Sequence, residues 1–144
     1  MPTGTYAHPA DIVASATPEE MRRLRSANVV LVNMPLRESA PPNCAPLGPA
    51  LLAAVLRARG CEHVSILDLN AYRVMDGDAA ARGLTSGRHL TDDEAGDLIR
   101  RHIRAKGAPH LVGMSGKTTT LRWQKVVAKI VAEVAPGAML ISGG

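Results

Sequence analysis

The sequence contains no phenylalanine, and aromatic residues make up only 2% of it, as one tryptophan and two tyrosines. The core must therefore be built from aliphatic side chains and methionine. So few aromatic rings, lying far apart in the sequence, provide no stacking platform for nucleic-acid bases. The net charge of +4 is dispersed, and several basic residues fall in the last turns of predicted helices, where the helix dipole favours cations. We therefore expect no nucleic-acid partner.

Cysteine is almost as scarce. Cys44 and Cys61 form neither a disulfide framework nor a metal-ligand spacing, which fits a reducing compartment. The start of the chain lacks the basic and then apolar pattern of a secretory signal peptide. No apolar run approaches the ~20 residues that a membrane helix needs. We expect a cytoplasmic protein with no membrane partner and, because its histidines are scattered, no protein-bound metal.

Short apolar runs alternate along the chain with helical patterns. Four apolar, β-branched runs predict buried parallel strands, at residues 28–33, 63–70, 110–115 and 138–142. Helical patterns lie between them, at residues 49–59, 91–106 and 121–135. This alternation predicts an α/β fold with a doubly wound parallel sheet, flavodoxin-like or Rossmann-like, in the strand order 2-1-3-4.

Two regions of the chain differ in character. Residues 1–27 form a lead-in whose capping box, Thr17 to Glu20, predicts a short helix. Residues 28–144 form the α/β domain. The helix at residues 49–59 is apolar on most sides, so we expect it to be largely buried.

The predicted binding site lies at the carboxyl ends of the strands, where open α/β sheets bind ligands. The long loop after the first strand, residues 34–47, leads into this edge of the sheet. Small or polar residues follow the other three strands, namely Asp68, Asn70, Ser115, Gly116, Lys117, Gly143 and Gly144. The glycines would let a large flat ligand approach the backbone. For Asp68 and Asn70, capping of a turn is the alternative role.

Several common sites are excluded by missing residues. Gly116-Lys117-Thr118 resembles the end of a phosphate-binding loop, but position 111 is leucine where that loop needs glycine. No G-x-G-x-x-G follows the first strand, as a dinucleotide fold requires. The third strand ends without the acid of a phosphoryl-receiver domain. No nucleophile and base are paired, so the sequence predicts no catalytic residue.

Four segments together resemble the N-terminal cobalamin-binding domain of cobalamin-dependent radical SAM enzymes. They are PLGPALLAAVL at 46–56, LDLN at 67–70, LVGMS at 111–115 and PGAMLISGG at 136–144. In the wider family, D-x-H-x-x-G follows the first strand. Asn43 and Ala45 occupy the D and H positions here, so the histidine ligand to cobalt is lost. Ser115 and the final glycine pair are kept, and Lys117 replaces a leucine.

The resemblance implies a cobalamin site and a place for it in a larger enzyme. The cofactor-binding residues would be Asn43, Ala45, Leu47, Gly48, Asp68, Asn70, Ser115, Gly116, Lys117, Gly143 and Gly144. The full enzyme, typically a methyltransferase, would also hold a [4Fe-4S] cluster and S-adenosylmethionine. The C-x-x-x-C-x-x-C motif of that catalytic domain is missing from this chain, so the catalytic domain would be a partner.

The family order also places a fifth strand and a final helix after the fourth strand. We therefore expect this chain to be truncated before them. Two other functions remain open. One is a degenerate α/β interaction module of a radical SAM protein that no longer binds cobalamin. The other is a flavodoxin-like domain that binds a flavin or a nucleotide.

Overall fold

The structure, a computed structural model, describes residues 17–35, 45–73, 81, 90–116 and 118–143. Its centre is a four-stranded sheet in which every neighbouring pair is parallel, in the order β2-β1-β3-β4. The strands are β1 (Asn28–Asn33), β2 (His63–Asp68), β3 (Leu111–Ser115) and β4 (Met139–Gly143). The predicted fold class and strand order are confirmed.

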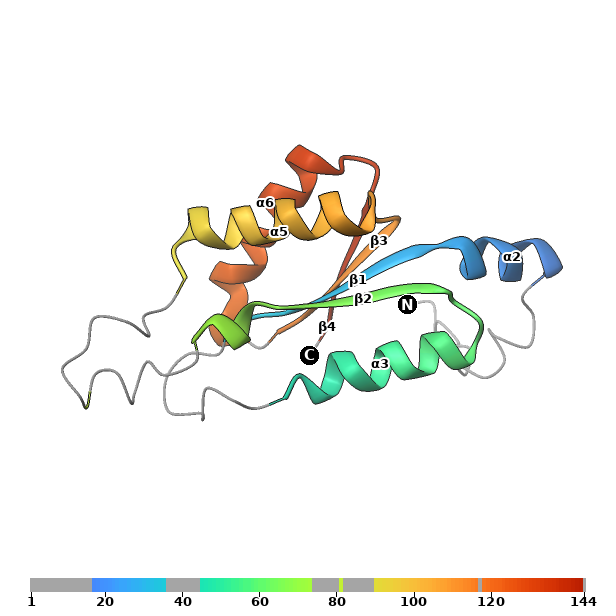
Figure 1. Ribbon diagram of the computed structural model, residues 1–144, viewed down its shortest axis with the longest axis horizontal. Coiled ribbons are helices and arrows are strands. Elements are labelled where there is room, and N and C mark those ends of the chain that lie inside the picture. The colour runs from blue at the N-terminus through green and yellow to red at the C-terminus, as the bar shows by residue number, and fades with distance from the viewer. Residues whose placement is uncertain (1–16, 36–44, 74–80, 82–89, 117, 144) are drawn as a thin grey trace, which may run out of the picture.

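Helices cover both faces of the sheet (Figure 1). The helix α3 (Leu47–Ala58) lies on one face, and α5 (Asp92–Lys106) and α6 (Leu121–Val134) lie on the other. The short helix α2 (Pro18–Ser26) leads into β1 and begins with the predicted capping box. The architecture is that of a doubly wound, flavodoxin-like α/β domain. Among the helices of the described ranges, none is long and apolar enough to cross a membrane.

The larger core cluster lies between the sheet and the helix pair α5 and α6. The apolar faces predicted for both helices are buried here, comprising Ala95, Leu98, Ile99, Ile103, Trp123, Val127, Ile130 and Val131. Alternate residues of the strands, such as Val30 and Val112, complete the cluster. This side of the domain therefore has the two packed layers that a stable α/β fold requires.

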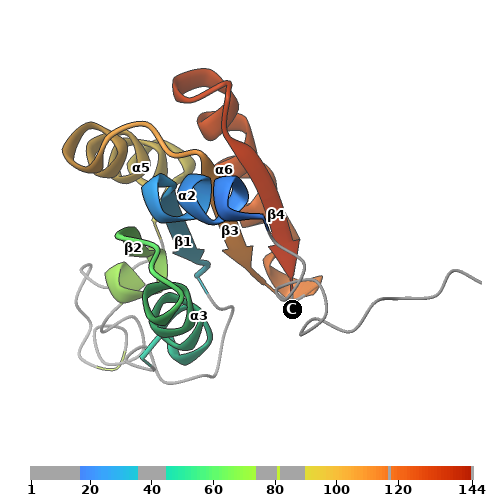
Figure 2. The same cartoon turned by 90° about the vertical axis from the view of Figure 1, so that its right-hand side faces the viewer.

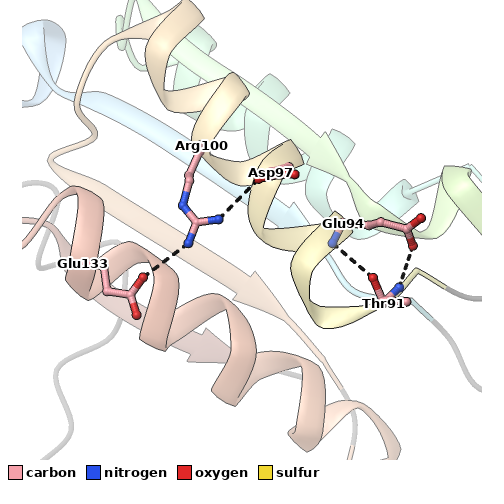
Figure 3. Close-up of polar contacts among 5 residues, drawn as sticks. All are labelled: Thr91, Glu94, Asp97, Arg100 and Glu133. Carbon is pink, nitrogen blue, oxygen red and sulfur yellow. Dashed lines mark hydrogen bonds and ion pairs between the residues drawn. The ribbon is translucent and has the colours of Figure 1, made fainter.

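Polar contacts fix the helix α5 at its start and against α6 (Figure 3). At its N-terminus, Thr91 and Glu94 form a capping box in which each side chain accepts a hydrogen bond from the other residue's backbone N–H. Further along, the Arg100 guanidinium lies 3.4 Å from both Asp97 and Glu133. Because Glu133 belongs to α6, Arg100 links the two helices.

The second strand is shorter than its sequence pattern predicts. β2 ends at Asp68, and the 3-10 helix η1 (Leu69–Arg73) follows directly. The Asp68 carboxylate accepts a hydrogen bond from the backbone N–H of Asn70 at 3.0 Å. An aspartate that bonds two residues ahead closes a turn and ends an extended strand, so Asn70 leaves the sheet.

The predicted burial of α3 is wrong for most of the helix. Only Pro49 and Ala53 are buried, whereas Leu47 and Leu51 are 76% and 67% exposed. α3 packs on β1 and β2, so only one of its faces contacts the sheet. In the part of the chain that the structure describes, its outward apolar face remains open. The sequence pattern indicates how apolar a helix is, but not whether a second layer covers it.

His102 on α5 should make the stability of the domain depend on pH. Its Nε2 lies 2.9 Å from the Ser65 hydroxyl on β2. Partial burial, together with the nearby Lys106 ammonium, lowers the pKa of His102 below its ordinary 6.5. Between these two pKa values the unfolded chain binds more protons than the folded chain, so stability falls as pH falls through about 6.5.

Urea unfolding at a series of pH values would measure this loss. We expect His102→Gln, which keeps a polar partner for Ser65, to flatten the fall in stability between about pH 7 and pH 5. The exposed His63 offers the matched control, His63→Gln. A pH profile unchanged by His102→Gln would contradict the assignment.

Candidate functional site

The parallel register aligns four residues in one row at the carboxyl edge of the sheet. Asn33 is paired with Asp68 on one side and with Ser115 on the other, and Ser115 is paired with Gly143. Since side chains alternate between the faces of a sheet, these positions share a face. That face is the one covered by α3, because Leu31, two residues before Asn33, packs in the same cluster as Ala53 of α3.

A cavity of about 400 Å³ opens beside this row, between α3 and the uncovered half of the sheet. Its lining residues come from four elements and are Leu31, Gly48, Pro49, Leu52, Gly113, Met114, Ser115, Ile141, Ser142 and Gly143. In Figure 2, α3 lies beside β1 and β2, whereas β4 stands at the opposite edge of the sheet. The helix therefore forms one wall of the cavity, and β3 and β4 form its floor.

Glycines give the cavity its depth. A methyl group added at Gly113 would lie 2.9 Å from Leu31 Cδ2, so no larger residue fits there without movement. One added at Gly143 would have no neighbour within 4 Å and would project into open space. Gly48 of α3 faces Ser115, whose Oγ lies 4.0 Å from the place of a Gly48 side chain. A flat ring could therefore slide between the helix and the bare backbone of the strands.

Hydrogen bonds hold the rim of the cavity on the side of α6. The backbone N–H of Gly116 donates to the Gly143 carbonyl at 3.1 Å, which joins the ends of β3 and β4. The Ser142 hydroxyl donates to Gln124 Oε1 at 2.9 Å. The Gln124 amide and the buried Thr120 hydroxyl lie over Gly116, where a side chain would collide with both. Gly116 thus supports the rim without lining the cavity.

On the side away from the cavity, the row continues with the hydrogen-bonded side chains of Asn33 and Asp68. Asn33 Nδ2 donates to Asp68 Oδ1 at 2.8 Å, and the backbone N–H of Asn70 donates to the same oxygen. Asn33 and Asp68 are half-buried, so both remain accessible from the rim. Asn33 was not among the predicted site residues. The pattern that could have indicated it is a polar residue at the end of an apolar strand, as at Asp68 and Ser115.

The structure brings some predicted site residues together and leaves others apart. Gly48, Ser115 and Gly143 line the cavity, and Asp68 lies in the same row. Ala45 and Leu47 are exposed beside the cavity but do not line it. Asn70 is buried, within η1. Predicted residues outside the described ranges are Asn43, Lys117 and Gly144.

The chemistry of the lining favours binding over catalysis. Most of the lining is apolar. Of its two serines, Ser142 donates to Gln124 on the side of α6, and the lining residues include no base beside the Ser115 hydroxyl. A hydroxyl without a base is a weak nucleophile. Within the described ranges, no three histidine, cysteine, aspartate or glutamate residues gather in a way that could hold a metal ion. The cavity suits an uncharged, flat ligand group with a few polar atoms at its edge.

Nothing in the lining is specific to one ligand by itself. A cleft at the carboxyl edge of a parallel sheet occurs in many unrelated α/β proteins, so the fold alone does not assign a function. Comparison with known proteins finds no protein-family model that matches this chain, no similar curated protein and no similar solved structure.

Proposed function

We propose that this domain binds cobalamin. The observation that supports the proposal best is the glycine-floored cavity at the carboxyl edge of the sheet. Gly48, Ser115 and Gly143 come from three separate segments of the family resemblance, and they meet at this one cavity.

The cavity fits the flat base at the end of the cofactor's nucleotide tail. Its volume of about 400 Å³ lies within the range of ligand pockets, roughly 300–1,000 Å³. Its side chains are apolar apart from Ser115, because the Ser142 hydroxyl is bonded to Gln124. The Ser115 hydroxyl can donate or accept one hydrogen bond at the edge of the base. The corrin ring is too large for the cavity, so it would lie across the row formed by Asn33, Asp68 and Ser115. Bound cobalamin would supply a cobalt ion that carries a methyl group.

Neither the cavity lining nor the position of the family's histidine offers a nitrogen ligand for the cobalt. Ala45 takes the position of the family's histidine, and its methyl group has no donor electrons. The cavity lining contains no imidazole. We therefore propose binding with the cofactor's own base held away from the cobalt, and without a histidine ligand from the protein.

The wider role follows from the resemblance. A cobalamin domain of this kind would serve a radical SAM methyltransferase, whose catalytic domain holds a [4Fe-4S] cluster and S-adenosylmethionine. This chain would contribute the cobalamin site, and that domain would be its partner. The two catalytic cofactors would bind in that domain, because the C-x-x-x-C-x-x-C motif that holds the cluster is missing from this sequence.

Incubation with hydroxocobalamin, followed by desalting, tests the proposal. We expect the protein to retain about one cobalamin per chain, seen by its visible absorbance. Electron paramagnetic resonance of the reduced cobalt(II) form should show no nitrogen superhyperfine splitting. Ala45→His is the positive control, since an imidazole there is a good metal ligand and should introduce the splitting. Protein that emerges colourless would refute the proposal. Splitting in the unaltered protein would show that a nitrogen does coordinate the cobalt, and binding without a nitrogen ligand would be wrong.

The open face of α3 favours a second function, that of an interaction module. Leu47, Leu51 and Val55 are all about half exposed or more, and they extend along the outward side of the helix. Contiguous exposed apolar residues mark surfaces that bind other proteins. In the colourless case above, this degenerate module of a radical SAM protein would remain, as would a flavodoxin-like domain that binds a flavin or a nucleotide.

A further inference from the structure

The pair formed by Asn33 and Asp68 has unused hydrogen-bonding capacity at the rim of the site. Asp68 Oδ1 accepts two hydrogen bonds, from Asn33 Nδ2 at 2.8 Å and from the backbone N–H of Asn70 at 3.0 Å. These bonds close the turn after β2 and account for one carboxylate oxygen. Among the described residues, no lysine, arginine or histidine forms an ion pair with Asp68, so within these ranges its negative charge is met only by the two N–H donors.

The orientation of the Asn33 amide determines which of its atoms face away from Asp68. Its Nδ2 must face Asp68, because a carboxylate only accepts hydrogen bonds. The Oδ1 atom of Asn33 is a further acceptor, and the second N–H of its Nδ2 is a donor. The pair therefore presents mainly acceptors, one negative charge and a single amide N–H to anything that lies over the rim.

The pair formed by Asn33 and Asp68 lies in the same row as Ser115, which lines the cavity. Neighbouring strands lie about 4.8 Å apart, so Asn33 is roughly 5 Å and Asp68 roughly 10 Å from Ser115 along the row. All three side chains lie on the α3 face of the sheet. A ligand whose base enters the cavity beside Ser115, and whose larger part covers the rim, would bring its periphery over this pair.

We infer that Asn33 and Asp68 select a ligand with uncharged carboxamide groups at its periphery and reject one with carboxylates there. The inference rests on the proposed function, since cobalamin carries acetamide and propionamide groups around its corrin ring. An amide N–H would donate to the acceptors of the pair. A carboxylate in the same place would bring a second negative charge beside Asp68, which half-buried surroundings make costly.

The binding of cobalamin monocarboxylic acids, each with one amide hydrolysed, tests this inference. We expect the unaltered chain to bind at least one of these acids about tenfold more weakly than hydroxocobalamin, the usual worth of one charged contact. Asp68→Asn should remove most of that difference, because its amide keeps an acceptor and lacks the charge. Asn33→Ala should weaken hydroxocobalamin itself several-fold. Ser65→Ala, also on β2 but on the opposite face, is the control and should change neither affinity.

The outcomes separate the inference from the proposed function. If the chain fails to bind hydroxocobalamin, the proposed function falls, and this inference falls with it. If it binds hydroxocobalamin and every monocarboxylic acid equally, the inference alone is wrong. An unchanged preference in Asp68→Asn would also refute it. Should Asp68→Asn not fold, Asp68→Ser, which retains an acceptor for the Asn70 N–H, provides the same comparison.

Discussion

Replacing Ser115 by tryptophan should strongly weaken cobalamin binding. Ser115 lies where the wall formed by Gly48 meets the floor of the cavity, and its Oγ is 4.0 Å from the place of a Gly48 side chain. An indole there would occupy the space proposed for the cofactor's base. We expect a loss on the order of 100-fold in affinity, about 2.7 kcal/mol, which is within the usual cost of overfilling a packed site. Titration followed by absorbance would measure it.

Two further variants make this result specific. Ser115→Ala removes only the hydroxyl, so affinity should fall by a few-fold, the worth of one neutral hydrogen bond. Ser26→Trp places the same large ring on the exposed end of α2, away from the cavity, and should leave affinity unchanged. Unchanged binding by Ser115→Trp would show that cobalamin binds elsewhere, even if the domain belongs to the proposed family.

Replacing Gly116 by alanine should destabilise the whole domain. The added methyl group would lie 2.5 Å from Thr120 Oγ1 and still closer to the Gln124 amide. Gln124 could swing aside, at the loss of its bond to Ser142, but Thr120 is fully buried and cannot move freely. Overpacking of this kind costs about 1–3 kcal/mol. Urea unfolding monitored by circular dichroism would measure the loss.

Matched glycine variants control for the change in backbone entropy. A methyl group at Gly137 would have no neighbour within 4 Å, so Gly137→Ala should not destabilise the fold. Gly143→Ala also meets no neighbour but stands at the floor of the cavity, so it should leave stability unchanged and weaken cobalamin binding. If Gly116→Ala unfolds at the same urea concentration as Gly137→Ala, the packing over Gly116 is not as tight as described.

Much of the fold could be predicted from the sequence because buried parallel strands carry a strong local signal. The run at β1 is apolar on both faces, as a strand covered by helices on both sides must be. The capping boxes at Thr17 and Thr91 marked two helix starts correctly. The end of a strand was predicted less well where a side chain replaces the strand's backbone hydrogen bonds. Asp68 accepts a bond from the Asn70 N–H, so β2 ends two residues earlier than predicted.

Some residues of the site could likewise be predicted from the sequence, whereas others required the tertiary structure. The sequence alone determined that Ser115 and Gly143 would lie at the same edge, because all strands of a parallel sheet end on one side. Only the tertiary structure decided that Asn33 joins them in one row, because membership depends on register and on which face each residue points to.

The tertiary structure also decided which glycines matter and which helix face stays open. Gly113 and Gly116 are both glycines in or directly after the third apolar run, and the sequence does not distinguish their roles. In the structure, Gly113 lies in the floor of the cavity, whereas Gln124 of α6 covers Gly116. The apolar pattern of α3 predicted burial, and packing on β1 and β2 covered only one side of the helix. A local pattern records what a segment prefers, whereas burial depends on which neighbours the rest of the chain brings to it.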